Sequence, residues 1–208
     1  MPAQGEPTAT LLLRHGQTPM SVQKRYAGRS DIPLTDVGLQ QAAAAAKRLA
    51  SAGIDVIVAS PLLRARQTAG EVAATTGAPV VTDDGFRETD FGAWEGLTFA
   101  EVRERWPAEV SAWLADPAVP PPDGESFTQV SERVSAALQR VLADRAGQTV
   151  LIVSHVTPIK MLVTAALLAP PAALYRMHLD VAALCEIDWY ADGPAVLRSF
   201  NDTGHLAG

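Results

Sequence analysis

Short apolar runs alternate with stretches of helical spacing along most of this chain. Runs at 11–13, 54–59 and 149–153 are bounded by breakers and predict buried strands, and a run at 80–82 predicts a short strand between the last two. Strands that alternate with helices are typical of a parallel sheet covered on both faces. The pattern therefore predicts an α/β three-layer sandwich, with helices on both faces of a mostly parallel sheet.

The first two predicted helices are marked by capping signals and glycine breaks. One begins at Thr35 and ends at Gly53, and its expected buried face consists of Leu39, Ala42, Ala46, Leu49 and Ala50. The other begins at Ser60, which we expect to be the N-cap before a proline, and it ends near Thr75. Arg64 would then lie one turn into this helix, close to the end of the preceding strand.

The middle of the chain is irregular and predicts an insertion over the sheet edge. The segment 84–96 has no helical period and is rich in glycine, acidic and aromatic residues, so we interpret it as a functional loop. Thr98 opens a short helix with Glu101 three residues later, which is a capping-box pattern. Four prolines in 116–124 argue against regular structure there. We expect the insertion, about 92–124, to form a small helical lid.

The second half continues the alternation and ends with antiparallel strands. A long helix over 126–147 begins with another capping box at Ser126, and the next helix begins at Thr157. Alternating apolar and polar residues over 183–190 predict a half-exposed strand. A turn separates it from a last strand at 195–200, which would run antiparallel to it at the edge of the sheet.

Size and composition narrow the functional class. The chain has 208 residues, 48% of them apolar, and a formal net charge of -6, which together predict one globular domain over 9–208. It contains no block of lysines and arginines, so we expect no nucleic-acid binding by this domain. Residues 1–8 are polar and contain proline and glycine, and we expect a flexible tail or a linker remnant there.

The sequence also predicts where the protein works. The longest apolar stretch, 157–169, contains a proline and a lysine and is shorter than the ~20 residues that cross a bilayer, so we expect no membrane span. The single cysteine, Cys185, excludes an internal disulfide and fits a reducing compartment. We therefore expect a soluble, cytoplasmic protein.

Candidate chemistry lies where the predicted strands end. Arg14 and His15 follow the first strand, Arg64 follows the second, and Ser154 and His155 follow the fourth. The carboxyl ends of parallel strands meet at one edge of the sheet, where ligands bind in open α/β folds. Two guanidinium groups and two imidazoles at that edge predict a pocket for a compact dianion, and phosphate fits bidentate guanidinium contacts.

An imidazole beside bound phosphate favours nucleophilic catalysis. One ring nitrogen can attack phosphorus, and water can then release the phosphohistidine. The leaving alkoxide needs a proton, which a carboxyl group that is protonated for part of the time could donate. Glu88 is the preferred candidate because it follows the third strand, with Asp90 and Glu95 as competitors.

Two other kinds of site are disfavoured by the same residues. Paired histidines could bind a metal, but the chain has no His-x-His or His-Glu-x-x-His pattern and the arginines would repel a cation. A serine triad at Ser154 or Ser60 lacks the glycine frame of a nucleophile elbow, and no glycine-rich Walker loop is present.

Six motifs in order, over about residues 9–200, resemble the histidine phosphatase superfamily, the phosphoglycerate-mutase-like proteins. They are Leu13-Arg14-His15-Gly16-Gln17-Thr18, Pro33-Leu34-Thr35-x-x-Gly38-x-x-Gln41-Ala42, Ser60-Pro61-Leu62-x-Arg64-Ala65, Glu88-x-Asp90-Phe91-Gly92-x-Trp94-Glu95-Gly96, Gly124-Glu125-Ser126 and Val153-Ser154-His155. The stretches from Glu88 to Thr98 and from Ser154 to Lys160 are similar to α-ribazole-phosphatase-like members. They are also similar to the C-terminal acid phosphatase domain of actinobacterial bifunctional ribonuclease H/acid phosphatase proteins.

The resemblance implies a role for each matched residue. It implies His15 as the nucleophile, Glu88 as the proton donor, and a phosphate pocket of Arg14, Arg64 and His155. The further substrate contacts that it implies are Gln17, Thr18, Ser154, Glu125 and Ser126. It implies no metal and no organic cofactor, a small phosphate monoester as substrate, and possible native fusion to a ribonuclease H domain.

Two positions depart from the family pattern. Ser21 stands where an asparagine is often found six residues after the nucleophile, and we keep Ser21 as a candidate substrate contact. Val156 stands where a glycine often follows the second histidine, and its side chain would narrow the pocket floor. The first departure bears on the detailed phosphate contacts, and the second on which leaving groups fit.

Three functions stay open from the sequence. The leading hypothesis is a metal-independent phosphomonoesterase, an acid phosphatase that could act on α-ribazole phosphate. A phosphoglycerate mutase should need more cations around its bisphosphate, and residues 98–123 supply only Arg103 and Arg105. The third is a non-catalytic phosphate-binding module. The lid tryptophans could be lid core or pocket wall, and Arg25 and Tyr26 could reach a substrate.

Overall fold

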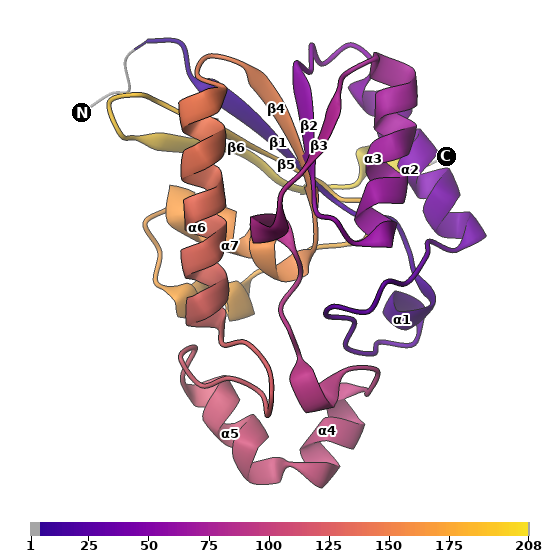
Figure 1. Ribbon diagram of the computed structural model, residues 1–208, viewed down its shortest axis with the longest axis vertical. Helices are drawn as coiled ribbons and strands as arrows, with labels where there is room; N and C mark the ends of the chain where they lie inside the picture. The colour runs from indigo at the N-terminus through magenta and orange to yellow at the C-terminus, as the bar shows by residue number, and fades with distance from the viewer. Residues whose placement is uncertain (1–4, 208) are drawn as a thin grey trace.

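The structure is a computed structural model that describes residues 5–207, and its centre is one six-stranded sheet (Figure 1). The strands are β1 (Thr8–Arg14), β2 (Val56–Ala59), β3 (Val80–Thr82), β4 (Thr149–Ser154), β5 (Leu184–Trp189) and β6 (Ala195–Asp202). Their order across the sheet is β3-β2-β4-β1-β5-β6. The first four are parallel, whereas β5 pairs antiparallel with β1 and β6 antiparallel with β5. The predicted α/β fold with an antiparallel edge is confirmed.

Helices cover both faces of the sheet (Figure 1). The α-helices are α1 (Pro19–Val22), α2 (Asp36–Leu49), α3 (Leu63–Thr76), α4 (Phe99–Arg105), α5 (Pro107–Ala115), α6 (Phe127–Asp144) and α7 (Val156–Ala166). Short 3-10 turns lie at Asp84–Phe86, Gly92–Trp94, Pro171–Arg176 and Gly204–Leu206. The pair α2 and α3 packs on one face and the pair α6 and α7 on the other. Among the described residues, no helix is long and apolar enough to cross a membrane.

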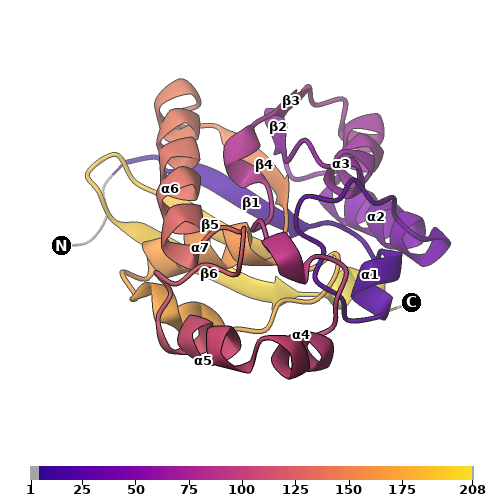
Figure 2. The same ribbon diagram turned by 60° about the horizontal axis from the view of Figure 1, so that its bottom comes forward.

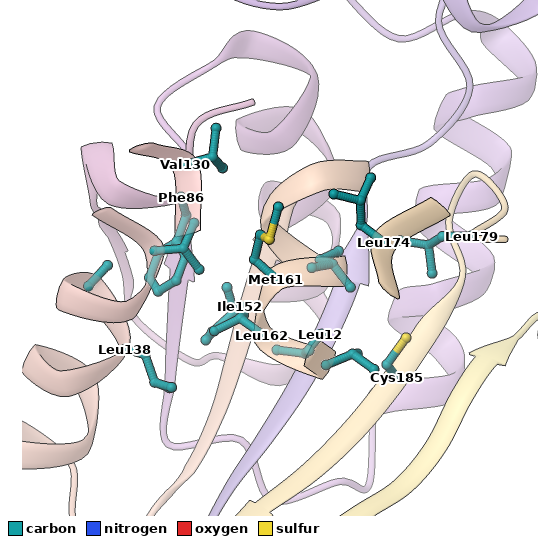
Figure 3. Close-up of a cluster of buried hydrophobic side chains, with 14 of the residues drawn as sticks. Leu12, Phe86, Val130, Leu138, Ile152, Met161, Leu162, Leu174, Leu179 and Cys185 are labelled. Atoms are coloured by element: carbon teal, nitrogen blue, oxygen red, sulfur yellow. The ribbon is translucent and has the colours of Figure 1, made fainter. Parts of the chain in front are cut away.

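The period of two along each strand divides the core into two buried clusters. Leu12 and Ile152 belong to the cluster under α6 and α7, which Figure 3 shows in part. Their strand neighbours Leu13 and Val153 belong to the other cluster, under α2 and α3. Successive side chains of a strand point to opposite faces, so a fully apolar run is what a sheet covered on both faces requires.

Local signals located most helices, with four corrections. The capping boxes at Thr98 and Ser126 are present, although α6 ends at Asp144 and not at Gly147. The loop after the first strand contains α1, which the sequence reading missed, with Thr18 as its N-cap. Helix α7 begins at Val156, one residue earlier than predicted, with His155 at its N-cap position after the end of β4.

The fourth correction covers the start of α3 and the end and buried face of α2, which ends at Leu49 and not at Gly53. Ser60 is not an N-cap, because α3 begins only at Leu63 and its cap position has no side-chain hydrogen bond. On α2, Leu39 is 38% exposed, and Ala45 takes its place in the core. Ala50 lies beyond the last helical residue and is exposed, so it is not part of the stripe.

The tail predicted over 1–8 does not include Thr8, which is the first residue of β1. Thr8 is buried in β1, where it pairs with Trp189, and its hydroxyl accepts a hydrogen bond from the Gly147 N–H at 3.0 Å. Residues 1–4 of the predicted tail lie outside the described residues. The ordered domain therefore begins no later than Thr8.

The insertion between β3 and α6 forms the predicted small helical unit. Its helices α4 and α5 lie away from the sheet, below α6 in Figure 1 and toward the viewer in Figure 2. Trp94 and Trp113 are buried and their rings meet edge to face, with centroids 5.3 Å apart. Trp106 packs against the same cluster. These tryptophans are the core of the insertion, which anchors it to the rest of the domain.

Two glycines let the loop after β1 touch the start of α2. A Cβ at Gly38 would lie 2.1 Å from the carbonyl oxygen of Gln17, and one at Gly16 would lie 2.4 Å from the carbonyl oxygen of Gly38. Both contacts involve backbone atoms, which cannot turn aside as a side chain can. The close approach fixes the loop that carries His15.

We expect Gly38→Ala to lower the free energy of unfolding by about 1 to 3 kcal/mol, the usual cost of overpacking. Gly70→Ala is the matched control, because nothing lies within 4 Å of its added Cβ on α3. It should raise stability by up to about 1 kcal/mol through helix propensity. Urea unfolding of both variants checks the contrast, and equal effects of the two substitutions would contradict it.

Candidate active site

The carboxyl ends of β1 and β4 bring the predicted site residues together. Arg14 is the last residue of β1, and His15 follows it. The neighbouring parallel strand is β4, and His155 follows its last residue. A cavity of about 230 Å³ opens at this edge. Its lining residues are Arg14, His15, Thr18, Ser21, Arg25, Tyr26, Ala27, Glu88, Phe91, Val156 and Thr157.

His15 presents an unprotonated ring nitrogen at the cavity. Its Nδ1 lies 2.8 Å from the carbonyl oxygen of Gly16, which can only accept, so this nitrogen carries the proton. Its Nε2 then accepts a hydrogen bond from Nε of Arg64 at 3.3 Å. Burial lowers the pKa of His15 well below its ordinary value, and the charges of Arg64 and Arg14 lower it further. The ring is therefore neutral, and its Nε2 lone pair, which accepts the hydrogen bond from Arg64, can act as a nucleophile once that bond is given up.

Arg64 is completely buried beside the nucleophile. Its Nη1 and Nη2 donate to the carbonyl oxygens of Ser30, Ala27 and Gly28, at 2.8 to 2.9 Å. Burial lowers its pKa from the ordinary value, and the charge of Glu88 opposes that shift. The three carbonyl groups orient the guanidinium, so that its Nε points at His15.

Arg14 supplies a second cation to the cavity. Its Nη1 donates to the carbonyl oxygen of Leu179 at 2.6 Å, and its buried Nε has no hydrogen-bond partner in the structure. Burial lowers its pKa to about 10, which still leaves the group charged at neutral pH. A half-buried cation with an unused donor beside a cavity is suited to binding an anion.

His155 completes the cationic and imidazole cluster. Its ring meets that of His15 edge to face, with centroids 5.1 Å apart, and its Nε2 lies 2.7 Å from the hydroxyl oxygen of Ser60. Burial lowers the pKa of His155 well below the ordinary value, and the charge of Arg64 adds to the effect. Its buried Nδ1 has no hydrogen-bond partner. Ser60, expected as a helix cap, instead orients this ring.

Glu88 is the carboxyl group that reaches the cavity. It is buried, and its Oε1 accepts hydrogen bonds from the N–H groups of Thr89 at 2.8 Å and Thr157 at 3.3 Å. Its competitors are engaged elsewhere. Asp90 pairs with Arg29 at 3.1 Å, and Glu95 accepts hydrogen bonds from the loop at 28–30. Position therefore favours Glu88 as the group that exchanges protons with a bound molecule.

Six of the predicted site residues do not line this cavity: Arg64 and His155, which contact His15, and Gln17, Ser154, Glu125 and Ser126. The Ser154 hydroxyl donates to the carbonyl oxygen of Phe86 at 2.7 Å, and the Gln17 side chain accepts from the Thr35 hydroxyl at 2.9 Å. Ser126 is the N-cap of α6, and Glu125 pairs with an arginine of that helix. Thr18 and Ser21 do line it, although their hydroxyls already take part in the capping box of α1.

The structure adds residues that the sequence left open or did not select. Arg25 and Tyr26 line the cavity, and Phe91 packs its ring 4.6 Å from that of Tyr26. Arg25 is partly neutralised there by an ion pair with Glu101 at 2.9 Å. Phe91 stands within the Glu88 motif, three residues after Glu88, and this position was the signal for it. Among the described residues, no three His, Cys, Asp or Glu side chains gather to hold a metal ion.

The lowered pKa values of His15 and His155 predict an acid-sensitive fold. Unfolded histidines titrate near 6.5, so below that pH the unfolded chain takes up protons that the folded state does not. We expect the free energy of unfolding to be constant above about pH 6.5 and to fall below it, by about 1.4 kcal/mol per pH unit for each histidine. Urea unfolding between pH 7.5 and 5 measures this.

A variant at an exposed histidine is the control for this pH dependence. His178 is exposed, so His178→Asn is the surface substitution with which the buried histidines are compared. A free energy of unfolding that stays level down to pH 5 would contradict the assignment of two buried neutral imidazoles.

Comparison with known proteins gives matches over nearly the whole chain. The model of the histidine phosphatase superfamily (branch 1) matches residues 10–203. The bifunctional protein Rv2228c of Mycobacterium tuberculosis is 52% identical over 205 residues, which are 98% of this chain and 56% of that protein. The probable phosphoglycerate mutase GpmB of Yersinia pestis is 34% identical over 203 residues, which are 94% of this chain and 93% of GpmB.

A solved structure agrees with these sequence matches. It is a putative alpha-ribazole-5'-P phosphatase from Escherichia coli, 28% identical, which aligns with 94% of this chain and 97% of its own at a TM-score of 0.87. The chain spans about half the length of Rv2228c, the bifunctional relative that it matches at 52% identity. These similarities agree with the resemblance carried by the sequence motifs.

Proposed function

Because this chain belongs to the histidine phosphatase superfamily, we propose that it is a metal-independent phosphomonoesterase that acts through a phosphohistidine at His15. One observation carries the proposal. His15 lines a cavity together with Arg14 and Glu88, and its Nε2 lies 3.3 Å from Nε of Arg64. A nucleophile, fixed positive charge and a carboxyl group are the groups that phosphoryl transfer needs.

The proposed reaction has two steps with one proton carrier. Arg14, Arg64 and His155 bind the phosphoryl oxygens while Nε2 of His15 attacks phosphorus. The bond from phosphorus to the alkoxide oxygen breaks, and Glu88 gives its proton to that oxygen. Water then attacks the phosphohistidine, Glu88 takes the proton back, and inorganic phosphate leaves with His15 restored.

We propose activity that extends into acidic solution, as in an acid phosphatase. The attacking imidazole must be neutral, and both burial and the neighbouring arginines keep the pKa of His15 well below the ordinary value. The nucleophile therefore stays unprotonated under conditions where an exposed histidine is charged.

The substrate that we propose is a small phosphate ester whose leaving group has a flat, uncharged part, as α-ribazole phosphate does. Tyr26, Phe91 and Val156 add apolar surface to the cavity lining. Arg25 is the further cation in the lining, and its charge is already paired with Glu101. A panel of phosphorylated metabolites ranked by kcat/KM identifies the preferred leaving group.

A phosphoglycerate mutase is the second candidate function, favoured by the similarity to GpmB. Its bisphosphate would need cations beyond the phosphate pocket, but Arg103 and Arg105 of α4 are exposed and do not line the cavity. Incubation with 3-phosphoglycerate and a trace of its bisphosphate separates the two functions. Release of inorganic phosphate supports hydrolysis, whereas formation of 2-phosphoglycerate supports the mutase.

Hydrolysis of p-nitrophenyl phosphate in EDTA tests the proposed enzyme against a non-catalytic phosphate-binding module. Release of nitrophenolate by the wild-type protein supports a metal-independent enzyme. Absence of release over about pH 5 to 8, the range in which imidazole titrates, would overturn it.

We also propose that this domain occurs fused to a second one, a ribonuclease H domain. The share of Rv2228c that it spans, 56%, leaves room for such a partner. The only cysteine, Cys185, is buried in β5, and burial raises the pKa of its thiol to about 11. We propose a reducing, cytoplasmic location on this basis, because a domain with one cysteine gains no internal disulfide in an oxidising compartment.

A further inference from the structure

The loop that carries Glu88 has few backbone partners of its own. It runs from Asp84 to Asp90, between β3 and the insertion, and it pairs with no strand. Backbone carbonyl groups that are withdrawn from water need donors from elsewhere. The position of the Glu88 side chain therefore depends on what binds the backbone of this loop.

Arg133 of α6 supplies those donors from a single guanidinium. Its Nη1 donates to the carbonyl oxygens of Gly85 at 2.9 Å and Arg87 at 2.8 Å. Its Nη2 donates to the carbonyl oxygen of Glu88 at 3.1 Å. Three carbonyl groups within four consecutive residues are thus bound to one side chain on a long, packed helix.

Glu125 holds the same guanidinium in place. Its two carboxylate oxygens accept from Nε and Nη2 of Arg133 at 2.7 and 2.8 Å, which is a bidentate pair, and only 13% of the Glu125 side chain is exposed. The backbone N–H of Glu125 also donates to the carbonyl oxygen of Asp90 at 2.8 Å. Glu125, which was predicted to contact substrate, therefore binds the end of the loop at Asp90 and also orients Arg133.

Close packing leaves the loop little freedom to shift. A Cβ at Gly85 would lie 2.5 Å from the Cβ of Ala137, one turn after Arg133 on the same helix. The backbone of the loop thus lies directly on α6. The next two side chains of the loop have different surroundings. Arg87 pairs with Asp84 at 3.0 Å, whereas Glu88 lines the cavity.

We propose that Arg133 is a positioning residue for proton transfer, because it fixes the backbone from which Glu88 reaches the leaving-group oxygen. This inference rests on the proposed function, in which Glu88 is the proton donor. Lysine cannot replace Arg133, since one ammonium nitrogen cannot reproduce the planar fork that binds Glu125 and three carbonyl groups together.

Leaving groups of different basicity separate positioning from a merely structural role. An alkyl phosphate such as glycerol 2-phosphate releases a strongly basic alkoxide and needs the proton, whereas p-nitrophenolate leaves without it. We expect Arg133→Lys to lower kcat/KM for the alkyl ester about 10- to 100-fold, a part of what general acid catalysis contributes. The same variant should lower kcat/KM for p-nitrophenyl phosphate less than about 3-fold. A structural defect would lower both values equally.

Two further variants complete the experiment. Glu88→Gln should give the same dependence on the leaving group, and the double variant with Arg133→Lys should lose little more than Glu88→Gln alone. Arg140→Lys is the matched control, since Arg140 lies on the same helix and pairs with Asp83 at 2.8 Å without touching these carbonyl groups. It should leave the ratio of the two kcat/KM values unchanged.

The outcomes separate this inference from the function on which it rests. If Glu88→Gln discriminates between the two esters but Arg133→Lys lowers both equally or neither, the positioning role is wrong and the proposed function stands. If Glu88→Gln does not discriminate, Glu88 is not the proton donor and both proposals lose their basis. A change in the ratio for Arg140→Lys as large as for Arg133→Lys would also overturn the inference.

Discussion

His15→Ala is expected to abolish phosphate ester hydrolysis, with a fall in kcat of about 10⁴-fold or more, as for the loss of other catalytic nucleophiles. Alanine has no lone pair to attack phosphorus, and water in its place would lack the position that Nε2 holds, 3.3 Å from Arg64. The cations of the cavity stay, so we expect the variant still to bind inorganic phosphate. Activity toward p-nitrophenyl phosphate and phosphate binding by calorimetry measure the two effects.

Trapping the intermediate makes the test specific. Rapid quenching in base, which preserves phosphohistidine, should yield labelled wild-type protein and no label in His15→Ala. His178→Ala is the control, because His178 is exposed and lies outside the cavity lining. Hydrolysis that survives in His15→Ala, or label that persists there, would show that another residue is the nucleophile.

Arg64→Met should damage both the fold and the reaction. Methionine fills much of the volume but leaves the carbonyl groups of Ala27, Gly28 and Ser30 without their donors. We expect a loss of about 2 to 4 kcal/mol in the free energy of unfolding. We also expect kcat to fall about 10²- to 10³-fold, as for the loss of one donor to a developing charge.

Arg66→Met is the matched control for this prediction. Arg66 lies two residues further along α3, its side chain is 50% exposed, and its nearest acid is Asp31 at 3.8 Å. An exposed pair at this distance contributes at most about 1 kcal/mol, so stability and activity should stay close to wild type. Equal losses in the two variants would contradict a special role for Arg64. Urea unfolding and p-nitrophenyl phosphate kinetics are the measurements.

Local pattern was sufficient for the elements and for one edge of the site. The run from Leu11 to Leu13 predicted a buried strand because the side chains that point to either face of the sheet are apolar. Parallel neighbours then place Arg14 and His155 at one edge, since all parallel strands end there. The same reasoning brought Glu88 to that edge, where it lines the cavity.

Local pattern failed where a polar side chain had two possible partners. Ser60 before a proline is a normal helix cap, but its hydroxyl lies 2.7 Å from His155, 95 residues away. The family resemblance implied that Glu125 contacts substrate, yet Glu125 pairs with Arg133 of the following helix and does not line the cavity. A short motif does not state which neighbour a hydrogen bond will choose, because that neighbour comes from a distant segment.

The sequence by itself therefore determined the α/β architecture, the strand ends and the residue types that meet at them, because strand period and breaker positions are local properties. Only the tertiary structure decided what each polar group binds. The proton on Nδ1 of His15, the burial of Arg64 and the attachment of the Glu88 loop to Arg133 all depend on segments that fold against one another. Hydrogen bonds and desolvation depend on distances in space, which the order of residues does not contain.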